Sequence, residues 1–257
     1  MKKMNTRTLR SFKQKTQNRP LQMLTCYDYQ TAQLLNSTPL DMILVGDSVG
    51  NVVLGYDTTV QVSLEEMLIF SSAVKRGAPD KFVVADLPFG TYATLEQGID
   101  NASKLFQKAA VEAVKLEGAF PYQLELISRL TQIGIPVMGH IGLTPQSVHQ
   151  QGGYYMHGKN ADSAGQLVEA AKNLQQAGCF SVVLECVTPD VATEITNELN
   201  IPTVGIGSGT QTDGQVLVIN DLLKLGPEAP PSFCKPIVDM YQHKIDAITQ
   251  YLNHVTH

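Results

Sequence analysis

The chain has 257 residues, of which 43% are hydrophobic and 17% are charged, and its formal net charge is -5. This composition is typical of a soluble globular protein, and the negative charge argues against nucleic acid as a partner. No apolar run approaches the roughly 20 residues that a membrane-spanning helix needs. We therefore expect no membrane partner, and the cytoplasm is the default location.

The N-terminal segment carries seven basic residues and no acidic residue before Asp28. Within it, Leu9 and Phe12 are spaced to share one face of a helix, so we expect a short amphipathic helix that covers one end of the domain. The four cysteines of the chain form no Cys-x-x-Cys pair. We interpret them as reduced thiols in or beside the core.

Short apolar runs that end in glycine or an acid predict eight buried strands. We place them at residues 21–27, 42–45, 82–86, 113–117, 135–142, 181–185, 201–207 and 215–219. Helices are expected between most of them, at 30–36, 64–75, 95–110, 121–133, 161–177 and from Thr188 onward, and a last helix at 237–253. Ser63 and Glu66 form a capping box. The β-branched residues of 51–62 predict extended or hairpin structure.

Eight strands that alternate with helices within about 250 residues are typical of a (β/α)8 barrel. We therefore predict an α/β protein with a single TIM-type barrel domain over residues 1–257, an N-terminal capping helix and a C-terminal helix. A doubly wound open sheet is the alternative, because periodicity alone cannot close a barrel.

Several of the predicted strands end in a carboxylate. Asp47 follows the second strand, Asp86, Glu117 and Glu185 end three others, and His140 lies near the end of the fifth. The carboxyl ends of barrel strands form the active-site face, so these side chains would lie close together there. Mg²⁺ prefers oxygen ligands, commonly one or two carboxylates. The pattern predicts a Mg²⁺ site held by two aspartates, with the other groups available for acid–base chemistry.

Each of these residues also has a structural explanation. Asp47 or Asp86 could be the N-cap of the segment after its strand. Lys115 and Glu117 are two residues apart on one strand, so they point the same way and could form an ion pair. His140 could be a core histidine. The coincidence of five such residues at strand ends favours a functional site.

Six stretches of the chain, in order, resemble the ketopantoate hydroxymethyltransferase family. They are residues 44–48, 85–89, 114–118, 139–147, 184–186, and 205–209 with 212–215. The run from Gly139 to Ser147 is by itself long enough to be specific. Ala119 and Ser208 depart from the family pattern, in which glycine and alanine are usual at these positions.

The resemblance implies a reaction. A hydroxymethyl group passes from 5,10-methylenetetrahydrofolate to 3-methyl-2-oxobutanoate through a Mg-stabilised enolate, giving 2-dehydropantoate, in the first committed step toward pantothenate. The resemblance also implies one Mg²⁺ per subunit and a homodecamer of two pentameric rings. By motif, Asp47, Asp86 and Glu117 bind Mg²⁺, and Glu185 accepts the proton. Asp47, Ser48, Asp86 and Lys115 bind the substrate. His140 is a further candidate, from its position alone, for a residue that lies behind the ligands.

Two other functions fit the same residues. A Mg²⁺-dependent lyase or mutase of the isocitrate lyase and phosphoenolpyruvate mutase type would use the same metal and enolate without folate. A catalytically silent barrel that serves as a scaffold would need none of the carboxylates. The acids on four strands argue against the scaffold.

Overall fold

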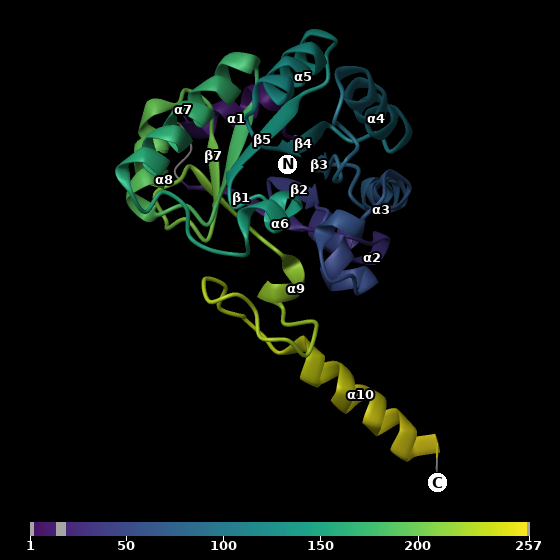
Figure 1. The fold of residues 1–257 in the computed structure, drawn as a ribbon. Coiled ribbons are helices and arrows are strands. Elements are labelled where there is room, and N and C mark those ends of the chain that lie inside the picture. Colours follow the sequence, from purple (N-terminus) through teal and green to yellow (C-terminus); the bar gives the residue numbers. More distant parts are fainter. Residues whose placement is uncertain (1–2, 14–18, 256–257) are drawn as a thin grey trace. The chain divides into compact units, whose positions relative to one another are not determined.

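The computed structural model describes residues 3–13 and 19–255. Eight parallel strands form a closed barrel in the order β1 to β8, which confirms the barrel over the open sheet (Figure 1). The strands are β1 Leu21–Thr25, β2 Met42–Val45, β3 Phe82–Asp86, β4 Ala113–Glu117, β5 Val137–Gly142, β6 Ser181–Glu185, β7 Thr203–Ile206 and β8 Gly214–Leu217. Each of the eight predicted strands is present, with its ends moved by no more than two residues.

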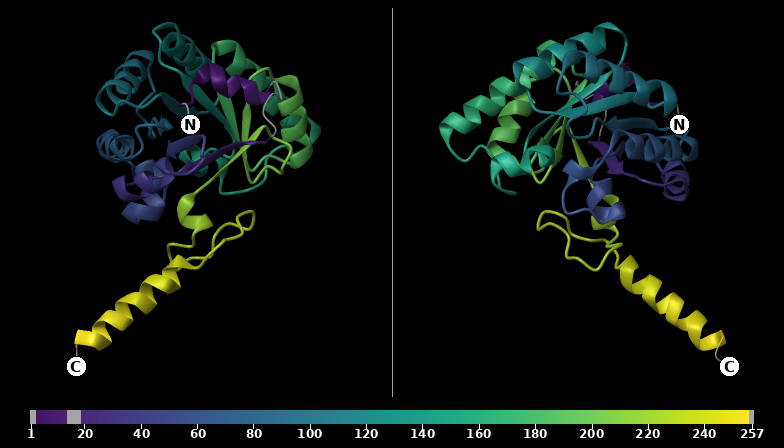
Figure 2. Two further views of the ribbon diagram at one scale, coloured as in Figure 1. Left: turned by 180° about the vertical axis from the view of Figure 1, so that it is seen from behind. Right: turned by 45° about the vertical axis from the view of Figure 1, so that its right-hand side comes forward.

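Helices surround the strands on the outside of the barrel, as the two further views show (Figure 2). They are α2 Tyr29–Asn36, α3 Leu64–Gly77, α4 Leu95–Lys108, α5 Pro121–Gln132, α7 Ala161–Ala177 and α8 Pro189–Glu198. The short helix α6, Val148–Gln151, lies in the connection between β5 and α7. The capping box of α3 forms as expected: the Glu66 amide donates to Ser63 Oγ at 3.2 Å, and the Ser63 amide donates to Glu66 Oε2 at 2.7 Å.

The expectation of extended structure at 51–62 is wrong. The segment forms a π-helical turn, Gly50–Leu54, and a 3₁₀ turn, Thr59–Gln61. Gly55 closes the first turn with φ +74°, a left-handed conformation that glycine adopts without strain. The Tyr56 amide then donates to the Gly50 carbonyl at 2.8 Å. Local hydrogen bonds around one glycine override the β preference of the valines.

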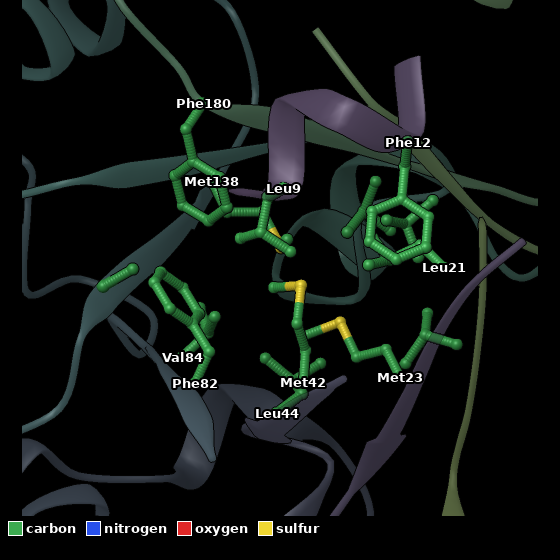
Figure 3. Close-up of a cluster of buried hydrophobic side chains, with 14 residues drawn as sticks. Leu9, Phe12, Leu21, Met23, Met42, Leu44, Phe82, Val84, Met138 and Phe180 are labelled. Atoms are coloured by element: carbon green, nitrogen blue, oxygen red, sulfur yellow. The ribbon is translucent and has the colours of Figure 1, made fainter. Parts of the chain in front are cut away.

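An apolar cluster fills the N-terminal end of the barrel (Figure 3). Helix α1, Thr6–Lys13, contributes Leu9 and Phe12, which are buried against side chains from the starts of the strands. Phe82 and Phe180 meet edge to face with ring centroids 5.5 Å apart. The cluster also contains Leu21, Met23, Met42, Leu44, Val84, Ala113, Met138, Val183, Val204 and Val216. Because this end of the barrel is filled by apolar side chains, we look for the functional site at the opposite end, where the strands have their carboxyl ends.

The chain divides into two compact units, residues 1–216 and residues 217–257. The second unit contains α9, Ile219–Leu222, and α10, Met240–Val255, and the Ile237 amide donates to the Leu222 carbonyl at 2.9 Å. Helix α10 has no buried residue. In residues 3–13 and 19–255, every helix is too short or too polar to span a bilayer. The single domain over 1–257 stays a prediction.

Candidate active site

The strand register brings the predicted polar residues to one end of the barrel. Asp86 is paired with Lys115 across β3 and β4, and Glu117 is paired with His140 across β4 and β5. Because side chains alternate along a strand, Lys115 and Glu117 share a face. The structure therefore brings Asp86, Lys115, Glu117 and His140 together. Asp47, just after β2, joins them through Asp86, and Glu185, at the end of β6, joins them through His140.

Asp47 and Asp86 are joined through the backbone. The Asp47 amide donates to Oδ2 of Asp86 at 3.0 Å, and both carboxylates are buried. Burial, then repulsion from Asp86 and Glu117, raises the pKa of Asp47 well above its usual range. Burial also raises the pKa of Asp86, although Lys115 opposes this. The two carboxyl groups therefore hold their protons more tightly than they would in water.

Lys115 supplies positive charge to the cluster. Its Nζ atom lies 3.0 Å from Oδ1 of Asp86 and 3.3 Å from Nδ1 of His140. The contact with Asp86 is an ion pair outside hydrogen-bond geometry, so Oδ1 remains buried without a hydrogen-bond partner in the described part of the chain. Burial alone would lower the pKa of Lys115, but attraction to Asp86, Glu117 and Asp47 outweighs it and raises the pKa. Lys115 is a fixed cation.

His140 lies between two carboxylates. Its Nδ1 is 3.5 Å from Oε1 of Glu117, and its Nε2 is 3.2 Å from Oε2 of Glu185, without the geometry of a hydrogen bond at Nε2. Burial and the charge of Lys115 lower the pKa of His140, but Glu117 and Glu185 together outweigh them and raise it to about 9. The Glu185 side chain is 18% exposed, whereas that of His140 is 3% exposed. Of these two groups, Glu185 is the more accessible to a ligand.

The backbone of Glu185 is held by a close approach of β5. Gly142 has φ +96°, and a Cβ atom there would lie 2.2 Å from the Glu185 carbonyl oxygen, so only glycine fits. The Leu143 amide donates to that same carbonyl at 2.8 Å. The next residue, Cys186, has φ +48°, a conformation that is uncommon for a residue other than glycine. Glu185 therefore lies at a tightly constrained turn.

Gln146 connects the acids, and sequence reasoning did not single it out. Its Nε2 donates to Oδ2 of Asp47 at 2.7 Å and to the Leu87 carbonyl at 3.0 Å. Its Oε1 accepts from the Tyr92 hydroxyl at 2.5 Å, and its backbone amide donates to Oε2 of Glu117 at 3.0 Å. Only its place in the run 139–147 pointed to it. We regard Gln146 as a positioning residue for Asp47 and Glu117.

Ser48 is half-buried beside this cluster, and its Oγ lies 2.8 Å from the hydroxyl of Tyr27. Tyr27 is a second residue that the sequence did not reveal as part of the site. Gly46 makes room here, because a Cβ atom on it would lie 2.8 Å from Oγ of Ser48 and 3.5 Å from Oδ2 of Asp86. In the described residues no three His, Cys, Asp or Glu side chains are arranged as a ligand set for a metal ion.

Comparison with known proteins identifies the family of the chain. The family model of ketopantoate hydroxymethyltransferase matches residues 3–257. Two proteins named 3-methyl-2-oxobutanoate hydroxymethyltransferase are similar along nearly the whole chain. That of Geobacillus sp. (strain WCH70) is 46% identical and covers 94% of this chain and 86% of its own length. That of Thermotoga sp. (strain RQ2) is 47% identical, with 98% and 92% covered.

Two solved structures with the same fold are less similar in sequence. A 2,3-dimethylmalate lyase of the PEP mutase/isocitrate lyase superfamily has a TM-score of 0.61 at 14% identity and covers 98% of this chain and 97% of its own. A phosphonopyruvate hydrolase complex with oxalate and Mg²⁺ has a TM-score of 0.62 at 12% identity, with 84% and 81% covered. These two show the barrel fold alone, whereas the family match rests on sequence along the whole chain. The chain belongs to the ketopantoate hydroxymethyltransferase family.

Proposed function

We propose that this enzyme transfers a hydroxymethyl group from 5,10-methylenetetrahydrofolate to 3-methyl-2-oxobutanoate and forms 2-dehydropantoate. The observation that carries the proposal is the name shared by relatives 46% and 47% identical over more than nine-tenths of the chain. The buried acids at the carboxyl ends of the strands supply groups that this chemistry needs. The overall change consumes one water, because the methylene carbon of the donor leaves as CH₂OH.

The donor set of the site suits Mg²⁺. Asp86 Oδ1 is buried and makes no hydrogen bond in the described residues, although it forms an ion pair with Nζ of Lys115 at 3.0 Å. Asp47 lies beside it with a pKa raised by burial and neighbouring carboxylates. One or two carboxylates are the usual protein contribution to a Mg²⁺ site, with water and substrate oxygens as the other ligands. We therefore propose Asp47 and Asp86 as ligands of one Mg²⁺ per subunit. Glu117, which is held by Gln146, is proposed as the third by family resemblance, and the three carboxylates of the described residues would have to move closer together to share one ion.

Each residue of the site has a separate role in the proposed reaction. When bound, Mg²⁺ would polarise the oxygens of the 2-oxo acid and favour loss of the C3 proton. Glu185 accepts that proton on a carboxylate oxygen that reaches the open side of the site. Lys115, a fixed cation, offsets negative charge on the substrate, and Ser48 offers its hydroxyl to the substrate. The C3 carbon then forms its new bond to the one-carbon unit of the donor, whose two carbon–nitrogen bonds break. Water supplies the hydroxyl oxygen, and the C3 proton and one proton of water end on the two donor nitrogens, so that tetrahydrofolate leaves.

Of the two alternative functions, the scaffold conflicts with the comparisons, and the lyase or mutase is supported by the fold alone. The silent scaffold is excluded, because the relatives are named as enzymes over the length of this chain. The lyase or mutase shares the fold at 14% identity, and fold alone does not favour its chemistry. The hydroxymethyl transfer requires 5,10-methylenetetrahydrofolate, whereas the lyase or mutase reaction does not, so an assay with and without this donor distinguishes them.

The direct test is product formation from 3-methyl-2-oxobutanoate with and without 5,10-methylenetetrahydrofolate, in the presence of Mg²⁺. We expect 2-dehydropantoate only with the donor, and exchange of the C3 proton into deuterium oxide without it. Cleavage or rearrangement of a 2-oxo acid in the absence of folate would instead favour the lyase.

Gln146→Met is expected to weaken Mg²⁺ binding about 10- to 100-fold, the loss typical of removing a group that orients a metal ligand. Methionine keeps the length of the side chain but leaves Asp47 Oδ2 and the Tyr92 hydroxyl without their partner. Calorimetric titration with Mg²⁺ measures the effect, and Tyr92→Phe should change the affinity in the same direction by less. Gln132→Met on the exposed side of α5 is the matched control. If Gln146→Met binds Mg²⁺ with the affinity of the wild type, Gln146 does not position the metal ligands.

We also propose a homo-oligomer, a decamer by family resemblance, in the cytoplasm. The C-terminal unit exposes apolar side chains that a monomer would leave in water: Ile237, Ile245, Ile248, Tyr251, Leu252 and Val255. We expect light scattering at micromolar concentration to give about ten times the 28.0 kDa of one chain. A mass near 28.0 kDa contradicts the proposal. Ile248→Asp should lower the mass if α10 lies in an interface.

A further inference from the structure

A cavity of about 330 Å³ lies within residues 1–216, between the loop after β4, the end of β5 and helix α7. Its volume is within the range of small-molecule sites. Gly118 and Phe120 line it from the loop, Ile141 from β5, and Leu167 and Ala170 from α7. None of the lining side chains has a part in the roles proposed above for the reaction.

The cavity adjoins the acid cluster. Gly118, in its wall, directly follows Glu117, and its amide donates to the His140 carbonyl at 2.9 Å. Gly142, also in the wall, is paired in register with Glu185. A third wall residue, His157, donates its backbone amide to the Cys186 carbonyl at 2.7 Å. Ile141 follows the inward-facing His140, so the cavity lies on the side of β5 that faces α7. A ligand in it would lie at the rim of the barrel, beside the backbone of Gly142 and Cys186 that adjoins Glu185.

The cavity lining is mainly apolar, and its polar groups include no carboxylate, lysine or arginine. Thr144, Gln151, His157, Ser163 and Gln166 supply hydroxyl, amide and imidazole groups. Two lining side chains each hold a buried atom with no hydrogen-bond partner in the described residues, Oε1 of Gln151 and Nε2 of His157. Such atoms are costly to leave unpaired. Rotation about the last bond of either side chain would offer them to a ligand.

Planar aromatic groups accompany these polar groups. Phe120 is exposed at the edge of the cavity, and its ring is stacked on that of Tyr122, with centroids 6.4 Å apart and an angle of 6° between the planes. The ring of Tyr155 is stacked on His157 at 4.5 Å. Flat faces beside neutral hydrogen-bonding groups suit a flat, uncharged heterocycle better than a phosphate or a carboxylate.

We propose that this cavity binds the reduced pterin ring of the one-carbon donor. The inference rests on the proposed function, in which a donor must bring its carbon next to Glu185. The pyrimidinone edge of a pterin carries N–H donors and a carbonyl acceptor, which match Gln151 Oε1 and His157 Nε2. The carboxylates of the donor's glutamate tail remain outside, because the lining has no cation to pair with them.

Filling the cavity tests the proposal. Ala170→Leu adds bulk from α7 with a good helix former, and we expect KM for 5,10-methylenetetrahydrofolate to rise at least about tenfold, as for a misfit of a methylene group or more in a pocket. Gln151→Met should raise KM roughly three- to tenfold through a lost hydrogen bond. Exchange of the C3 proton without folate should stay within about twofold of wild type, because the acid cluster is untouched.

Controls separate this inference from the proposed function. Gly165→Leu lies on the same helix, where an added side chain meets open space, and it should keep the wild-type KM. If the wild type neither exchanges the C3 proton nor uses the donor, the proposed function fails. If the wild type does both and Ala170→Leu keeps the wild-type KM, the cavity is not the donor site and only this inference fails.

The bound fragment is identified by competition. 6-Methyltetrahydropterin, which has no tail, should inhibit the wild type competitively against the donor, and its inhibition constant should rise at least about tenfold in Ala170→Leu. p-Aminobenzoylglutamate should inhibit both proteins alike. If Ala170→Leu instead weakens inhibition by p-aminobenzoylglutamate and leaves inhibition by 6-methyltetrahydropterin unchanged, the tail occupies the cavity and the assignment of the pterin is wrong.

Discussion

Glu185→Gln is expected to slow exchange of the C3 proton of 3-methyl-2-oxobutanoate about 10²- to 10⁴-fold, the contribution of a positioned general base. Glutamine keeps the size of the side chain and its reach to His140 but does not accept the proton. Binding of Mg²⁺ and of the 2-oxo acid should persist, because the aspartates are unchanged. Deuterium incorporation followed by NMR measures the exchange rate, and calorimetry measures binding. The loss should appear even without folate, since proton removal precedes the folate step.

His140→Gln is the comparison that identifies the base. His140 is the competing proton acceptor, but it is buried between Glu117 and Glu185, whereas Glu185 reaches the open side of the site. We expect His140→Gln to retain more exchange activity than Glu185→Gln. If Glu185→Gln exchanges at nearly the wild-type rate while His140→Gln does not, the base lies on β5 and the roles must be reassigned.

Asp86→Asn is expected to lose Mg²⁺ affinity and activity together, by at least the 10- to 100-fold that is typical of disturbing even a group behind a metal ligand. The change removes one negative charge from the cluster and leaves Lys115 with a neutral neighbour. Magnesium titration by calorimetry and the donor-dependent assay should show losses of similar size. Asp100→Asn, at an exposed position of α4, makes the same change in charge and should bind Mg²⁺ like the wild type. Unchanged Mg²⁺ affinity in Asp86→Asn would show that Asp86 is not a ligand.

The strands and their acids could be predicted because both are local in the sequence. A buried strand needs only a short apolar run, and an acid at its end has a known place once the barrel closes. Lys115 and Glu117 illustrate this: two positions apart on β4, they had to face the same way. The barrel geometry then placed them beside Asp86 and His140 without any further assumption.

The contacts of Gln146 could not be predicted in the same way. Its amide meets Asp47 from 99 residues away, on a 3₁₀ turn, Pro145–Ser147, whose conformation no periodic pattern reveals. The Tyr27–Ser48 contact has the same origin, since it joins the ends of two strands. The turns at 50–61 were mispredicted because the β preference of the valines was given more weight than the left-handed turn that Gly55 permits. Side-chain contacts between loops depend on three-dimensional geometry that strand patterns leave open.

The apolar cluster closed by α1 has a consequence for how this enzyme tolerates mutation. Charged groups buried at one end of the barrel are expensive to desolvate, so that end reduces the free energy of unfolding. Leu9, Phe12 and their neighbours at the other end compensate through apolar burial. Selection can therefore adjust thermal tolerance at the N-terminal end without disturbing turnover, whereas neutralising acids at the carboxyl end exchanges activity for stability. We expect substitutions that raise the free energy of unfolding without loss of activity to lie in the apolar cluster beneath α1, at the end of the barrel opposite Glu185.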